Sequence, residues 1–175
     1  MTKEERKEGN FNWAMLGNTN EGRPNLGPTT SVVIYRLMQF TLRDVLIREV
    51  GVVKAHEIFY DAGEAAGREF YRNVVTKKDS LNDYITNLQD LLKELKIGIL
   101  KVESADRDKL AFTIAVAEGL DCSGLPISDE EISTFDEGFF SGLFSELSGR
   151  KFITKEVDCW RSKDRVCRFE ARAIS

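Results

Sequence analysis

The chain has 175 residues, of which 42% are hydrophobic and 31% are charged, and its formal net charge is −4. This composition is typical of a folded protein with one hydrophobic core and excludes general disorder. The net acidity argues against nucleic-acid binding, and no apolar run approaches the roughly 20 residues that a membrane helix needs. Because the opening residues MTKEERKEGN lack the apolar segment of a signal peptide, we expect a cytoplasmic protein with reduced cysteines.

Residues 1–30 predict an irregular arm, because they are rich in Asn, Gly and charge and are interrupted by prolines. The remainder, 31–175, predicts a single domain that opens with helices. Ser31 is a good N-terminal cap for a first helix whose apolar residues recur with a period near 3.6, and Gly51 ends it. A second helix is expected over about 52–75.

A third helix begins at Ser80, where SLND resembles a capping box. From Ile97 the apolar period changes to two, so IGILKVES and KLAFTIAVAEG, on either side of a polar turn, predict an antiparallel hairpin. The capping box SDEE at 128–131 predicts a fourth helix that ends before Gly149, and 151–174 predict a second hairpin. This order predicts an α+β fold: N-terminal helices, then an antiparallel sheet of about four strands from two hairpins with a helix between them, and helices packed on one face.

The second and fourth predicted helices share a glycine pattern, YDAGEAAG at 60–67 and FDEGFFSG at 135–142. Glycines four positions apart lie on one helix face, and each interior Gly costs about 0.5–1 kcal/mol relative to Ala. Two interpretations are open. The helices cross backbone to backbone, in the core or across a dimer, or a flat ligand lies in the groove. The pattern favours close crossing.

The stretch EVDCWRSKDRVCRFEA predicts a hairpin that carries two of the three cysteines. With a three-residue turn, Cys159 and Cys167 face each other across the strands, with Cβ atoms about 4.5–5.5 Å apart, close enough to bind one metal ion. The alternatives are two buried thiols that act as small hydrophobic residues, or a disulfide, which a reducing compartment disfavours.

Zinc usually takes four ligands, so two more residues are needed beside these thiols. Strict alternation groups Cys159 with Ile153 and Val157 and puts Glu156 on the opposite face. Glu156 therefore joins the cluster only if a β-bulge intervenes. The remote candidate is Cys122, in the loop sequence GLDCSGLP.

Over roughly residues 31–172 the chain resembles the 4-vinyl reductase domain family of small-molecule-binding domains, a fold similar to nitric-oxide-sensing haem domains and to subunits of a Golgi tethering complex. The resemblance rests on IFYDAGEAAGREF, on FDEGFFSGLFSELSGRKFITKEVDC and on the ending C-x(7)-C-R-F. Members that sense aromatic hydrocarbons carry a structural zinc bound by two cysteines, a glutamate and a further cysteine. The resemblance implies Cys159, Cys167 and Glu156 here. The further cysteine is expected where this chain has Ile132-Ser133-Thr134, which leaves Cys122 as the fourth candidate.

The resemblance also implies a mostly apolar pocket between the sheet and the helices, near the metal. By position, its walls would be Phe112, Phe139, Phe140, Phe144 and Thr154, and Tyr84 would supply a hydroxyl group. Single aromatic residues at such positions are more often plain core, so the pocket rests on their number and convergence.

These features predict a binding module, a sensor or carrier for a small hydrophobic or aromatic molecule, with a structural zinc and a homodimer through the first helix and the arm. One alternative is a structural protein–protein interaction module with a filled core. Another is a reductase that acts on a vinyl group of a tetrapyrrole. The sequence has no dinucleotide fingerprint or phosphate-binding loop, so no nucleotide cofactor is expected. Its single histidine, His56, has no evident acid or nucleophile partner, and no catalytic residue is assigned.

Overall fold

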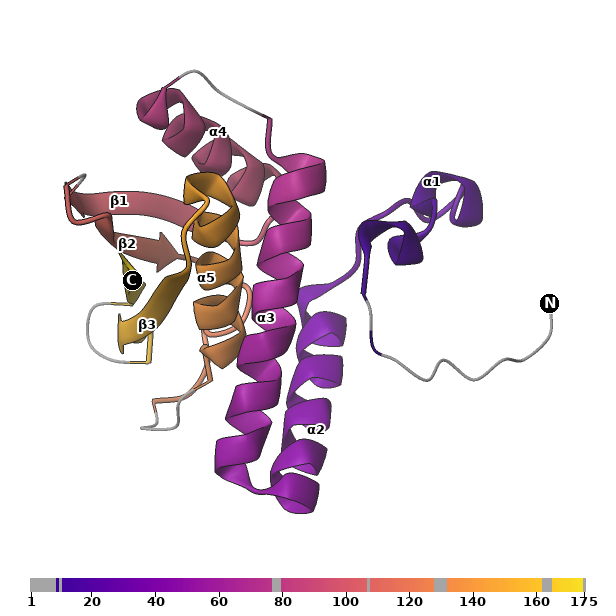
Figure 1. Ribbon diagram of the computed structural model, residues 1–175. Helices are drawn as coiled ribbons and strands as arrows, with labels where there is room; N and C mark the ends of the chain where they lie inside the picture. Colours follow the sequence, from indigo (N-terminus) through magenta and orange to yellow (C-terminus); the bar gives the residue numbers. More distant parts are fainter. Residues whose placement is uncertain are drawn as a thin grey trace.

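The computed structural model describes residues 9, 11–76, 80–106, 108–127, 132–161 and 165–174. In chain order, its elements are η1 (Trp13–Leu16), α1 (Thr19–Gly22), α2 (Val32–Val50), α3 (Val52–Val74), α4 (Leu81–Glu94), β1 (Ile99–Asp106), β2 (Ala111–Ala117), α5 (Thr134–Ser148), β3 (Phe152–Asp158) and β4 (Cys167–Ala173). Helices α2 and α3 form a long helical hairpin, and α3 packs along α5 beside the sheet (Figure 1).

The four strands form one antiparallel sheet in the order β1-β2-β4-β3. Each predicted hairpin contributes two neighbouring strands, and pairing of β2 with β4 joins the hairpins. Helix α5 connects them and lies against β3 and β4, while α4 lies against β1. The predicted α+β fold, with a helix between two hairpins and helices on one face, is confirmed.

The helix boundaries follow from local capping. Ser31 and Ser80 accept hydrogen bonds from backbone N–H groups of the first turns of α2 and α4, at 3.3 and 3.1 Å. Gly51 and Gly149 end α2 and α5 with φ of +81° and +68°, which favour glycine. The start of α5 was predicted too early: the helix begins at Thr134, and the SDEE box lies outside the described residues.

The glycine pattern produces a backbone-to-backbone crossing of α3 and α5. A Cβ atom on Gly63 or Gly67 would lie closer than 3.0 Å to backbone of α5, and one on Gly138 or Gly142 closer than 3.0 Å to backbone of α3. In every case the nearest atom is a carbonyl oxygen, and real Cβ atoms essentially never come so close. The close-crossing interpretation is confirmed. The glycine faces are occupied by the partner helix, so they are not a groove for a ligand.

Helix α2 buries its polar face and exposes its apolar face, which is the reverse of an ordinary surface helix. Its buried residues are polar, Gln39 and Arg43, whereas Val33, Leu37 and Met38 are 71%, 60% and 65% exposed. We define the exposed apolar face of α2 as Val33, Ile34, Leu37, Met38, Leu42 and Val45. A contiguous apolar surface of this kind marks an interaction site more often than a free surface.

The arm contains short helical segments, η1 and α1, where the sequence predicted irregular chain. It lies on the side of the helices away from the sheet (Figure 1). The backbone N–H of Trp13 donates to Glu69 Oε2 of α3 at 2.8 Å, which fastens η1 to the domain. Leu16 and Leu26 stay exposed.

Candidate functional site

Glu156, Cys159 and Cys167 lie together at the end of the second hairpin. One carboxylate oxygen and the two Sγ atoms are all within 4.8 Å of one another. The register of β3 against β4 shifts between Glu156 and Asp158. This is the β-bulge required for Glu156 to join the thiols, because one extra residue reverses the alternation beyond it.

The bulge also corrects the predicted grouping of Cys159 with Ile153 and Val157. Those two side chains are 38% and 50% exposed and point away from the helices, whereas Cys159 packs against the core. On the return strand β4, Cys167 lies at alternate positions with Phe169 and Ala171, and all three of these residues are buried.

The start of α5 holds Glu156 in place. Ser133 Oγ donates to Glu156 Oε1 at 2.8 Å, and the backbone N–H of Glu156 donates to Glu137 Oε1 at 2.8 Å. Lys155 Nζ forms an ion pair with the same oxygen of Glu137 at 3.1 Å. Sequence reasoning missed Ser133 and Glu137. The available signal was an acid, Glu137, on a helix whose other residues are mostly apolar or small.

The cluster holds its protons tightly as long as no cation is bound. Burial raises the pKa of Cys159 to about 12. The pKa of Cys167 is also raised, mainly by the interaction of its thiol with Cys122 and secondly by burial. Burial also raises the pKa of Glu156, although the hydrogen bond from Ser133 opposes this. A metal ion in this position would displace the protons and remove the electrostatic penalty.

Cys122 lies in the loop after β2 and is 1% exposed. It interacts with Cys167 but is not a member of the group within 4.8 Å. The loop is fixed by α2: Tyr35 Oη and Gln39 Nε2 donate to the two carboxylate oxygens of Asp121 at 2.7 and 2.9 Å. The polar face of α2 therefore holds the segment that carries the third cysteine.

Asp136, in the first turn of α5, adds a further acid to this region. Burial raises the pKa of its carboxyl group well above the usual range, and the nearby Asp121, Cys167 and Glu156 add to the shift. Carboxylate oxygens and thiolate sulfurs are the ligand types that bind cations such as zinc, and both are present here. Glu156, Cys159 and Cys167 could therefore hold a metal ion.

A small apolar cavity lies between α4, β1, β2 and α5. Its volume is about 20 Å³, enough for about one water molecule, and three of the predicted pocket residues line it: Tyr84, Phe112 and Phe144. Their neighbours in the wall are leucine, isoleucine and valine side chains, and no charged residue of the described chain lines it.

The other predicted pocket residues pack beside the cavity in the core. Phe140 stacks on Phe144 with ring centroids 6.1 Å apart, and Phe139 contacts Phe140 at 5.6 Å. Thr154 is 1% exposed and faces α5, where its backbone N–H donates to Ser141 Oγ at 2.8 Å. The structure therefore brings the predicted aromatics into one cluster, only part of which borders the empty space.

Two hydroxyl groups in this region are buried and make no hydrogen bond within the described chain, those of Tyr84 and Thr154. A buried hydroxyl without a partner is unusual in folded proteins and costs free energy. Only the hydroxyl of Tyr84 belongs to a residue that lines the cavity.

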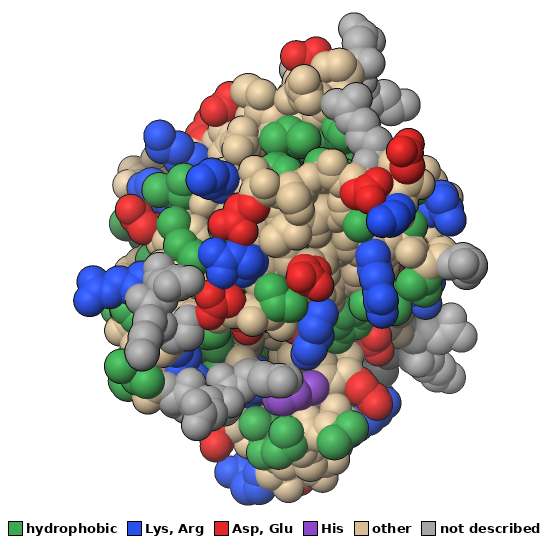
Figure 2. Space-filling view, turned by 90° about the vertical axis from the view of Figure 1, so that its left-hand side faces the viewer, with side chains coloured by type: hydrophobic (Ala, Val, Ile, Leu, Met, Phe, Trp, Pro, Cys, Tyr) green, Lys and Arg blue, Asp and Glu red, His purple; other side chains and the backbone are tan. Residues whose placement is uncertain are grey.

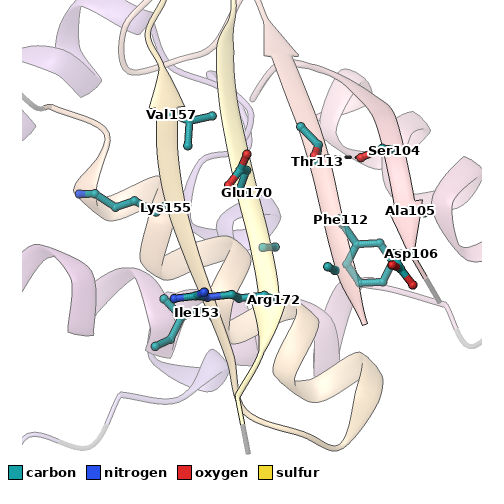
Figure 3. A pocket seen from close by; sticks show the side chains of 12 residues that line it. Ser104, Ala105, Asp106, Phe112, Thr113, Ile153, Lys155, Val157, Glu170 and Arg172 are labelled. Carbon is teal, nitrogen blue, oxygen red and sulfur yellow. Dashed lines mark hydrogen bonds between the residues drawn. The ribbon is translucent and has the colours of Figure 1, made fainter. Parts of the chain in front are cut away.

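A larger hollow, of about 500 Å³, lies on the opposite, solvent-facing side of the sheet (Figure 3). Lys155, Glu170 and Arg172 line it together with Ile153 and Val157. Because its floor is an open sheet surface with charges of both signs, it differs from the mostly apolar pocket between the sheet and the helices that the resemblance implied. Phe112, the second residue of the central strand β2, is among the residues that line both spaces.

On the face of the molecule seen in Figure 2, acidic and basic side chains are interspersed and neither sign forms a large patch. This face therefore lacks the continuous basic patch that is typical of nucleic-acid binding. Among the described helices, none combines the length and apolarity that crossing a lipid bilayer requires.

The chain is therefore an α+β domain with a four-stranded sheet backed by a helix pair and a Glu-Cys-Cys cluster on its last hairpin. Residues 112–173, from β2 to the end of β4, match the 4-vinyl reductase domain. This match agrees with the resemblance that the sequence motifs carry.

Two uncharacterized proteins of Methanocaldococcus jannaschii are similar in sequence. One is 26% identical over 149 residues, which cover 85% of this chain and 81% of that protein. The other is 25% identical over 124 residues, which cover 69% and 68% of the respective chains.

Solved structures share the fold at low sequence identity. The phenol-responsive sensory domain of the transcription activator PoxR, with phenol, is 14% identical with a TM-score of 0.64, over 85% of this chain and 78% of that one. A vinyl-4-reductase family protein from M. jannaschii is 18% identical with a TM-score of 0.59, over 89% of each chain. Subunit 3 of the trafficking protein particle complex from Naegleria fowleri, covalently bound to palmitic acid, is 10% identical with a TM-score of 0.65, over 82% and 95%.

Proposed function

We propose that this protein binds a small hydrophobic or aromatic molecule between α4, the sheet and α5, and acts as a sensor or carrier of that molecule. The observation that carries the proposal is the apolar cavity at which aromatic side chains from three elements meet, namely Tyr84, Phe112 and Phe144. Two proteins of the same fold support it: the PoxR domain responds to phenol, and the trafficking subunit holds palmitic acid.

Ligand entry requires the cavity to expand. Pockets for small molecules usually measure about 300–1,000 Å³, whereas this cavity measures about 20 Å³. Helix α4 is the element whose displacement would open it, because α4 forms one wall and packs against the edge strand β1. Binding of a ligand would then move α4 outward.

We propose further that Glu156, Cys159 and Cys167 hold a structural zinc, with Cys122 as the fourth ligand. Zinc accepts thiolate and carboxylate ligands and is bound tetrahedrally in structural sites. The three grouped donors, their burial and their shared interaction with acidic neighbours support this proposal. Zinc bound here would tie the second hairpin to the start of α5 and to the loop after β2.

The exposed apolar face of α2 supports a homodimer in which this face is covered by a second copy of the chain. We predict that Leu37→Glu, at a side chain that is 60% exposed, leaves the fold intact but converts the dimer into monomers. Sedimentation equilibrium measures the mass directly. The matched control is Arg48→Glu, at an exposed position near the end of the same helix. A wild-type protein that sediments as a monomer would contradict the proposal.

A second candidate function is a structural interaction module whose core is filled by its own side chains. The observation that favours it is the small volume of the cavity, about 20 Å³. In this case the exposed face of α2 would dock onto another protein, and the aromatic cluster would only stabilise the fold.

Titration with neutral aromatic probes separates the two candidates. Calorimetry with phenol and toluene should detect saturable binding to the wild-type protein. Leu88→Phe, in which a larger side chain extends into the cavity from α4, should abolish that binding and leave the protein folded. If neither probe binds the wild-type protein, the interaction module becomes the better account.

A further inference from the structure

Helix α2 faces the rest of the domain with polar side chains, namely Tyr35, Arg36, Gln39 and Arg43. The two of these that are buried, Gln39 and Arg43, are the buried residues of the whole helix. Contact between apolar groups is non-directional, whereas a hydrogen bond requires a donor–acceptor distance of about 2.7–3.2 Å and a favourable angle. The position of α2 on the domain is therefore sensitive to small movements of the groups that its polar face binds.

These groups belong to the connecting segment between β2 and α5, of which residues 118–127 and 132–133 are described. Its first end carries Cys122, which interacts with the Glu-Cys-Cys cluster. Arg36 donates to the backbone oxygens of Leu120 and Ser123, one before and one after this cysteine, at 2.8 and 2.9 Å. Two further side chains of α2 bind the carboxylate of Asp121. Helix α2 therefore holds the backbone on both sides of the third thiol.

The second end of the connecting segment carries Ser133, whose Oγ donates to Glu156 of the cluster at 2.8 Å. At this end α2 contributes Arg43, whose Nη1 donates to the backbone oxygen of Ile132 at 3.3 Å. Each end of the segment thus has one residue that contacts the cluster, Cys122 or Ser133, and acceptors for α2 directly beside it. A movement of either end changes the contacts on both sides.

We propose that α2 positions the donor atoms of the Glu-Cys-Cys cluster for a cation, and that a bound cation in turn fixes α2 on the domain. The inference rests on the proposed zinc site and adds how that site is coupled to a distant helix. Coupling between two sites is reciprocal, so zinc that favours the seated position of α2 is bound more tightly, by the same factor, when α2 is seated. Because the exposed apolar face lies on the outer side of α2, the state of the cluster also controls how this face is presented.

Competition with a chelator of known affinity measures the zinc affinity of the folded protein. Arg36→Met keeps the apolar part of the side chain but removes the hydrogen bonds beside Cys122, and it should weaken zinc binding about tenfold. Arg48→Met is the matched control. It makes the same substitution on the same helix, at a side chain that is 65% exposed and pairs with Glu49, and it should keep the wild-type affinity. Tyr35→Phe removes only the hydroxyl that binds Asp121 and should weaken zinc binding about threefold.

A second readout separates this coupling from a loss of overall stability. Amide relaxation measured by NMR reports local motion on the picosecond-to-nanosecond scale and does not detect rare global unfolding. Removing zinc from the wild-type protein should lower the order parameters of α2 below about 0.6 and leave those of α4 near about 0.85. At saturating zinc, Arg36→Met should show greater mobility of α2 than the wild-type protein or Arg48→Met.

The outcomes distinguish the coupling from the zinc site itself. If Arg36→Met and Tyr35→Phe bind zinc as tightly as the wild-type protein, or if α2 stays ordered after chelation, the coupling is overturned while the zinc site stands. If Arg48→Met weakens zinc binding as much as Arg36→Met, the effect comes from lost positive charge, and the positioning role of Arg36 is overturned. A wild-type protein that binds no zinc overturns both the zinc site and the coupling.

Discussion

Gly67→Ala is expected to destabilise the protein by about 3 kcal/mol or more. Its new Cβ atom would meet the carbonyl oxygen of Phe139 across the α3–α5 crossing, closer than 3.0 Å. Overpacking a core costs about 1–3 kcal/mol when side chains can adjust. Here the obstacle is backbone, so the two helices must separate. The higher helix propensity of alanine offsets at most about 1 kcal/mol of this loss of stability. Equilibrium unfolding in urea measures the loss.

Gly22→Ala is the matched control for this prediction. Gly22 ends α1 in the arm, and a Cβ atom there would meet nothing within 4 Å. This variant should therefore unfold at the wild-type urea concentration. A change of less than about 1 kcal/mol for Gly67→Ala would mean that the helices separate easily, and that the close crossing contributes little to the fold.

Cys167→Ser is expected to remove a bound zinc ion and to destabilise the protein by about 3 kcal/mol or more, because the free energy of binding a structural metal is part of the free energy of folding. Elemental analysis of the purified protein, together with native mass spectrometry, measures the metal content. A chelator should lower the stability of the wild-type protein and leave the stability of the variant unchanged. Loss of about 1 kcal/mol, with no metal in either protein, would favour buried thiols that only pack.

The same measurement identifies the fourth ligand. Cys122→Ser should weaken zinc binding if Cys122 completes the set, as its interaction with Cys167 suggests. Asp136→Asn is the matched comparison, because this carboxyl group faces the same cluster from α5. If the Cys122→Ser variant keeps its zinc and the Asp136→Asn variant loses it, the fourth ligand is Asp136 and not Cys122.

Local sequence signals located most of the elements correctly. Ser31, Gly51 and Ser80 mark helix ends because capping depends on one side chain or one backbone angle. The start of α5 was predicted too early because it does not depend on a local capping pattern alone. A capping-box pattern indicates that a helix is able to begin there, whereas tertiary packing against α3 and β3 selects the residue where it does begin.

The candidate site was predicted less completely than the fold. The spacing of Cys159 and Cys167 indicated a shared site, but alternation alone put Glu156 on the wrong face. Ser133 and Asp121 were missed because their partners are more than twenty positions away in sequence. Ser133 binds Glu156, and Asp121 binds Tyr35. Helical periodicity also failed to reveal that α2 turns its polar side inward, because the partner of that side is a loop rather than the apolar core.

By itself, the sequence determined the α+β order, the glycine pairs that require a backbone contact, and the types of atom available to a metal. These follow from periodicity, backbone freedom and side-chain chemistry, which are properties of short segments. The tertiary structure alone decided that a bulge joins Glu156 to the thiols, that the glycine faces meet each other, and that the Tyr84 hydroxyl is buried without a partner in the described chain. Each of these depends on which distant atoms share a space, and short-range patterns carry no information about that.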